Sequence, residues 1–179
     1  MLTLPFDVNR DHYWGDLHAS TELIQYGGYQ CSHCGDIWPI VKQLKESMGS
    51  DLRYVFRHFP LTNLHPLAME SAVAAEAAGL QGKFWLMHNK IMENQIYLNR
   101  ASLNVFAEEI GLDMNVFIRD CRNRQLFKKI KNDLESGLNS GVDGTPTFFV
   151  NGRMYSGFND FPDLLKVCRF ASDYYKMAA

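Results

Sequence analysis

The chain of 179 residues is predicted to form an α/β fold interrupted by a helical block, on three observations. Short apolar runs over residues 21–26 and 52–59 have the length of buried strands, with a helical pattern between them, as in a parallel strand–helix–strand unit. A long series of helical periods follows. The chain then returns to an apolar run, a hairpin signal and a last helix. This order predicts one sheet whose strands are separated in sequence by an insertion.

The first helix is predicted over residues 35–48 and is stopped by Gly49. Its apolar side chains fall at helical spacing, at Ile37, Trp38, Val41, Leu44 and Met48. Pro39 lies inside this helix and is expected to kink it without ending it. The preceding cysteine would then stand at a helix N-terminus.

The inserted block is predicted to contain five helices. Pro66 is placed as a first helical residue before residues 67–78, and a second helix covers residues 84–92. Ser102 and Asp113 are suitable caps for the third and fourth helices, and residues 124–138 form the fifth. We therefore predict an N-terminal part over residues 1–62, an inserted helical subdomain over 63–140 and a C-terminal part over 141–179.

The C-terminal part begins with a predicted strand over residues 145–151. Asn151-Gly152 is a strong hairpin signal, and Met154 and Tyr155 supply the returning strand. Asn159 or Asp160 can cap the last helix.

Composition narrows the function classes. The net charge is −2, so the chain lacks the basic excess that is typical of a nucleic-acid-binding protein. The basic cluster of Lys128, Lys129 and Lys131 is expected to be a solvated helix face. No apolar run reaches the ~18 residues that span a bilayer. The first 16 residues lack signal-peptide character, so the sequence as it stands predicts a cytoplasmic monomer, or an extracytoplasmic one if a signal has been removed.

A pair of cysteines, Cys31-Ser32-His33-Cys34, lies between the first predicted strand and helix. Free N–H groups and the dipole at a helix N-terminus favour a thiolate, so Cys31 is predicted to attack. Cys34 lies one turn further on, where burial keeps it protonated until it resolves a mixed disulfide. His33 adds a donor or a positive charge, which is expected to lower the Cys31 pKa. The pair predicts disulfide exchange without a dissociable cofactor.

A zinc site is the competing interpretation of a cysteine pair. Structural zinc takes four ligands, usually as two close pairs, whereas Cys121 and Cys168 lie alone on predicted helices. Both are expected to be buried as small apolar side chains, and no metal is predicted. His58, His65 and His88 are expected to be loop or core residues.

Four separated motifs carry a family resemblance. In order, they are Gln30-Cys31-Ser32-His33-Cys34, Arg57-His58-Phe59-Pro60-Leu61, Gly82-Lys83-Phe84-Trp85-Leu86-Met87-His88 and Gly144-Thr145-Pro146-Thr147-Phe148-Phe149-Val150-Asn151-Gly152. Together they resemble the DsbA-like thioredoxin-fold oxidoreductases, from about Leu23 to Leu165. The resemblance implies a thioredoxin-like fold with an inserted helical subdomain, a cis bond before Pro146, and pairing of the Thr145 backbone with an extended substrate. DsbA is the usual example of a low-pKa cysteine and an oxidising pair, so that expectation also comes from the resemblance.

The chain departs from the family at three positions. Gln25 stands where the family often has a glutamate, Gly28 where it frequently has an aspartate, and Ser32 where proline is common. Fewer carboxylates near the pair favour the Cys31 thiolate, but they remove a proton acceptor for Cys34.

The resulting hypothesis is an oxidoreductase acting on protein or small-thiol substrates, together with an unidentified redox partner. Two alternatives remain open: a cytoplasmic reductase or glutathione-linked relative, and a module that binds extended peptides near Pro146 without turnover.

Overall fold

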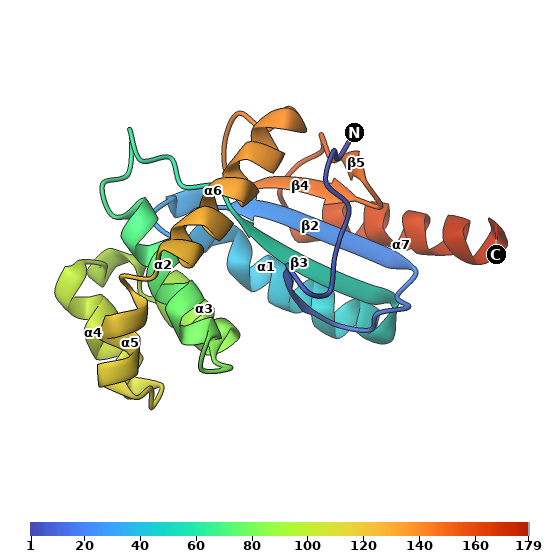
Figure 1. The fold of residues 1–179 in the computed structure, drawn as a ribbon. Helices are drawn as coiled ribbons and strands as arrows, with labels where there is room; N and C mark the ends of the chain where they lie inside the picture. The colour runs from blue at the N-terminus through green and yellow to red at the C-terminus, as the bar shows by residue number, and fades with distance from the viewer. Residues whose placement is uncertain (179) are drawn as a thin grey trace.

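The computed structural model describes residues 1–178, and a five-stranded mixed sheet forms its centre (Figure 1). The strands are β1 (His12–Trp14), β2 (Thr21–Gly27), β3 (Leu52–His58), β4 (Thr147–Val150) and β5 (Arg153–Met154), in the spatial order β1-β3-β2-β4-β5. β2 and β3 are parallel, and the other neighbours are antiparallel. The predicted α/β fold class is confirmed.

β2 and β3 are central because apolar side chains leave both of their faces. Leu23 and Tyr54 point into the larger core, while the next residues along each strand, Ile24 and Val55, point into a smaller core on the opposite face. All four are fully buried. Their alternation follows from the two-residue period of a strand.

The two faces are covered by different helices. α1 (Ser32–Met48) and α7 (Phe161–Ala178) lie against the larger core, behind the sheet in Figure 1. α6 (Arg124–Asn139) crosses the front face and packs on β3. The N-terminal segment also lies over this face, with Leu2 and Phe6 in contact with the smaller core.

The remaining helices lie in sequence between β3 and β4 and gather at one end of the sheet (Figure 1). They are α2 (Ala68–Gly79), α3 (Phe84–Glu93), α4 (Arg100–Glu109) and α5 (Met114–Asp120). Two 3₁₀ turns, η1 (Gly49–Asp51) and η2 (Gln95–Tyr97), follow α1 and α3. The domain limits at residues 62 and 140 stay predictions.

Several element ends differ from the sequence-based expectation. α1 begins at Ser32, three residues before the predicted start. α2 begins at Ala68, so Pro66 precedes the helix and is not its first residue. The N–H of Leu67, between them, donates to the Gln30 side chain. β1 was not predicted, because three residues are too few to show a period.

The cap of α4 is Asn99 and not Ser102. The Asn99 side chain accepts from the N–H groups of Ala101 and Ser102, and the Ser102 hydroxyl accepts from the Asn99 N–H. This reciprocal capping box uses Ser102 at the third helical position, where glutamate or glutamine is usual.

The hairpin and the last helix cap are confirmed. Asn151 and Gly152 both have positive φ, at 44° and 77°, as a two-residue turn of this kind requires. The returning strand is Arg153–Met154, one residue earlier than predicted. The Asp160 carboxylate accepts from the Asp163 N–H at 2.9 Å, which caps α7. Within residues 1–178, no helix is both long and apolar enough to cross a membrane.

Candidate active site

Cys31 occupies the N-cap of α1, directly after the loop that leaves β2. Its side chain makes no capping hydrogen bond, so the sulfur is not engaged by the helix end as a conventional cap. Cys31 is 7% exposed and Cys34 is fully buried, whereas Ser32 and His33 between them are exposed. The thiol that can meet a substrate is therefore Cys31.

The sheet brings a second segment to this point. β4 pairs antiparallel with β2, with Thr147 opposite Tyr26, so the residues preceding β4 lie beside the loop that follows β2. The Cys31 Sγ lies 3.2 Å from the Thr145 carbonyl oxygen, and the Thr145–Pro146 peptide bond is cis. Two segments 114 residues apart thus form one site.

The environment lowers the pKa of Cys31 to about 5. The largest cause is a hydrogen bond from the Cys34 thiol, with smaller contributions from Thr145 and from the backbone N–H groups of Cys34 and His33; burial opposes them. The Thr145 hydroxyl is buried and has no hydrogen-bond partner among residues 1–178, and its side chain is one of the groups that lower the Cys31 pKa. Cys31 can donate to the Thr145 carbonyl only while Cys31 is protonated, so ionisation of Cys31 breaks this hydrogen bond.

The pKa of Cys34 moves in the opposite direction, well above its usual value. Its S–H donates to Cys31, burial disfavours its charge, and a Cys31 thiolate would repel a second anion. The two thiols of the pair therefore differ, because the pKa of Cys31 is low and that of Cys34 is high. Burial also raises the pKa of Cys121 to about 11 and of Cys168 to about 12, although Cys121 is half-buried where full burial was expected.

His33 enters this geometry through its backbone. Its N–H favours the Cys31 thiolate, while its imidazole is exposed and makes no hydrogen bond among residues 1–178. The predicted influence of the imidazole on Cys31 stays a prediction.

Tyr54 of β3, which sequence reasoning did not single out, is buried within electrostatic reach of Cys34. Its hydroxyl donates to the Gln25 Oε1 at 2.6 Å, and burial and then the Cys34 charge raise its pKa well above the usual value. The position that often carries a carboxylate in the family is thus a neutral amide already engaged by a tyrosine. The sequence could not show this, because the hydrogen bond joins two residues that are 29 positions apart.

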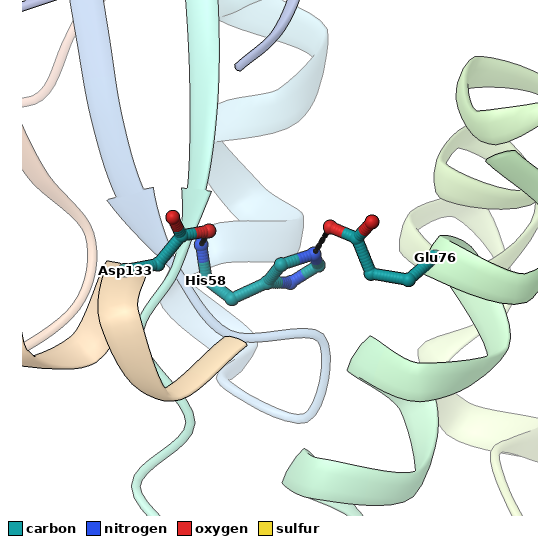
Figure 2. A group of neighbouring side chains, drawn as sticks. All are labelled: His58, Glu76 and Asp133. Atoms are coloured by element: carbon teal, nitrogen blue, oxygen red, sulfur yellow. Dashed lines mark hydrogen bonds and ion pairs between the residues drawn. The ribbon is translucent and has the colours of Figure 1, made fainter. Parts of the chain in front are cut away.

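A second cluster of titratable groups lies deeper in the molecule (Figure 2). His58 donates its backbone N–H to Asp133 and its ring Nε2 lies 2.9 Å from Glu76, so β3 is linked to both α6 and α2. The side chains of these three residues have the spacing of metal ligands. However, the Lys129 ammonium lies 2.5 Å from Asp133 and 3.4 Å from Glu76, and supplies the positive charge that the carboxylates require.

This cluster corrects the expectation for the basic residues of α6. Lys129 is not part of a solvated face: its side chain is 16% exposed and ion-paired, whereas that of Lys131 is 72% exposed. His58 and His88 are buried core residues, as predicted, and His65 is half-buried. Among residues 1–178, no group of three metal-ligating side chains includes a cysteine.

Comparison with known proteins places the chain in a family. The thioredoxin family model matches residues 7–168. The chain belongs to the thioredoxin family. A thioredoxin-like oxidoreductase from Silicibacter pomeroyi DSS-3 has 25% identity and a TM-score of 0.81, over 97% of this chain and 95% of its own. The α-DsbA1 of Wolbachia pipientis has 21% identity and a TM-score of 0.84, over 99% and 97%. The predicted resemblance to DsbA-like folds is confirmed.

Curated relatives add a different context. A protein of Salinispora arenicola named Na(+)/H(+) antiporter NhaA 1 is 42% identical over 156 residues, which are 87% of this chain and 24% of that protein. A protein of Herminiimonas arsenicoxydans named Na(+)/H(+) antiporter NhaA is 37% identical over 89% of this chain and 25% of its own length. The chain spans about a quarter of the length of these relatives.

Proposed function

We propose that the chain is a thiol–disulfide oxidoreductase in which Cys31 forms a mixed disulfide with the substrate and Cys34 resolves it. The observation that supports this most strongly is the placement of the two thiols in one Cys-x-x-Cys turn, with Cys31 at the N-cap of α1 beside the Thr145 carbonyl and Cys34 fully buried behind it. The opposite directions of their pKa shifts agree with this placement. The thiolate is the nucleophile and the better leaving group in disulfide exchange, whereas a thiol held protonated can wait inside the protein.

In the oxidising direction, a substrate thiolate attacks the Cys31 sulfur of a Cys31–Cys34 disulfide. The bond between the two cysteines breaks, and Cys34 leaves and takes up a proton. A second substrate thiolate then attacks the substrate sulfur of the mixed disulfide, which releases the Cys31 thiolate. The substrate gains one disulfide and the pair gains two electrons; a redox partner must reoxidise it. Run in reverse, the same steps reduce a substrate disulfide.

Thr145 and Pro146 are proposed to bind the substrate backbone. The Thr145 carbonyl is adjacent to Cys31 and loses its S–H donor when Cys31 ionises, so it becomes free to accept an N–H from an extended peptide. An added strand uses main-chain hydrogen bonds of this kind, which suits protein substrates of many sequences.

The low pKa of Cys31 favours the oxidising direction. Every interaction that stabilises the thiolate stabilises the reduced pair, and therefore makes the disulfide easier to reduce and a stronger oxidant. Such a role needs an oxidising compartment, whereas a reductase or glutathione-linked relative would work in a reducing one. Equilibration of the pair with glutathione decides between them.

The antiporter names belong to proteins of which the chain covers a quarter. We propose that in those relatives the matched quarter is a thioredoxin-family domain within a longer protein. The disulfide-exchange function proposed for this chain rests on its cysteines and its fold.

The test is transfer of one disulfide from the oxidised protein to a reduced, unfolded protein that contains two thiols. We expect stoichiometric transfer with wild-type protein and none with Cys31→Ser. In the reverse direction, reduced Cys34→Ala mixed with a disulfide-bonded substrate should accumulate a mixed disulfide through Cys31, because the variant has no Cys34 thiol to resolve it. A wild-type protein that binds unfolded peptides without exchanging disulfides would instead identify a binding module, and equal peptide binding by Cys31→Ser would support that outcome.

A further inference from the structure

Gln95, in the 3₁₀ turn after α3, reaches across to the loop that carries Cys31. Its side-chain Nε2 donates to the carbonyl oxygens of Tyr29, at 2.8 Å, and of Cys31, at 3.0 Å. These two carbonyls lie on either side of Gln30 in the chain. The Cys31 carbonyl also accepts from the N–H groups of Cys34 and Gly35, which begin the first turn of α1. One amide group therefore binds both the loop and the start of the helix.

Gly35 provides the space that Gln95 occupies. A Cβ added at Gly35 would lie 2.2 Å from the Gln95 Oε1 and 2.8 Å from its Cδ. Gly35 lies within α1, where glycine is less favourable than alanine by about 1 kcal/mol. The helix thus carries a residue that weakens it, at the position where a larger side chain would expel the Gln95 amide.

A second glutamine links the same loop to the helical group. The Gln30 Oε1 accepts the N–H of Leu67, just before α2. Gln95, outside the loop, donates to two of the loop's carbonyls, whereas Gln30, within the loop, accepts the N–H of Leu67 outside it. The active-site loop is consequently attached by side-chain amides to segments that precede α2 and follow α3.

We propose that Gln95 is a positioning residue that holds Cys31 against the start of α1 and beside Thr145, and that Gly35 is required because it leaves room for the Gln95 amide. This inference rests on the proposed role of Cys31. If Gln95 is removed, the two carbonyls lose their shared donor and the loop can move the sulfur away from the groups that stabilise its charge. The Cys31 thiolate should then be less favoured.

The experiment is a double-mutant cycle of Gln95→Ala and Gly35→Ala, read out as the pH dependence of Cys31 alkylation in the reduced protein. Each single variant is expected to raise the Cys31 pKa by at least about 0.5, which lowers the alkylation rate about two-fold near pH 5. The double variant should match Gln95→Ala, because alanine at position 35 then has no amide to expel.

The matched control is Gln81→Ala. The Gln81 side chain also binds a backbone segment, through both the N–H and the carbonyl of Asp113, but among residues 1–178 it makes no hydrogen bond to the loop that carries Cys31. It is expected to change stability without changing the Cys31 pKa. An unchanged Cys31 pKa in Gln95→Ala, or additive effects of the two substitutions, would overturn the proposal. Alkylation needs no turnover, so this outcome is distinct from a wild-type protein that fails to exchange disulfides.

Discussion

The hydrogen bond from Cys34 to Cys31 leads to a quantitative prediction for the attacking thiol. This bond is the largest cause of the low Cys31 pKa, which is about 5. Cys34→Ala removes the donor and leaves the rest of the turn in place. A hydrogen bond to a charged group contributes roughly 1.5–3 kcal/mol, which corresponds to about 1–2 pKa units. The Cys31 pKa should therefore rise to roughly 6–7.

Cys34→Ser is the matched control, because its hydroxyl can still donate to the thiolate. We expect its Cys31 pKa to stay within about half a unit of the wild-type value. The assay is the rate of alkylation of reduced protein as a function of pH. Near pH 6 the alanine variant should react roughly two- to ten-fold more slowly than wild-type protein. Equal shifts in the alanine and serine variants would show that loss of the sulfur itself, and not of a donor, sets the pKa.

Two further predictions concern stability. Because the folded pKa of Cys31 lies below the unfolded value of about 8.5, its stabilising effect is complete above that value and is lost as the pH falls to about 5. The free energy of unfolding of the reduced wild-type protein, measured in denaturant, should therefore increase relative to that of Cys31→Ser by about 2 kcal/mol between about pH 5 and pH 7. A difference between the two proteins that does not change with pH would contradict a low Cys31 pKa. Lys129→Met should cost roughly 3–5 kcal/mol because it leaves Asp133 buried without its cation, while Lys131→Met at the exposed pair should cost under about 1 kcal/mol; equal costs would mean that the cluster is solvated.

The sequence identified those parts of the site that are local in the chain. Cys31 and Cys34 could be assigned because a strand, a short loop and a helix follow one another without interruption. Thr145 and Pro146 could be named through the family resemblance, and β2–β4 pairing places Thr145 beside Cys31.

Features that depend on distant partners could not be predicted in this way. Gln95 contacts a loop more than 60 residues away, and Tyr54 meets Gln25 only across the sheet. Lys129 lies in a basic run that is typical of a solvated helix face, and only the approach of two carboxylates from other positions shows that it is buried. A side chain whose role depends on such long-range contacts leaves no periodic signal in its own segment.

The pairing of β4 with β2 also has a consequence for the order in which the protein is made. Cys31 and Cys34 emerge from the ribosome more than 100 residues before Thr145, and the whole helical insertion separates them. Contacts between such distant segments carry a large loop-closure cost and tend to form after local helices. A partly synthesised chain therefore carries two cysteines that lack their Thr145 neighbour, and the complete exchange site exists only once the last strands have joined the sheet.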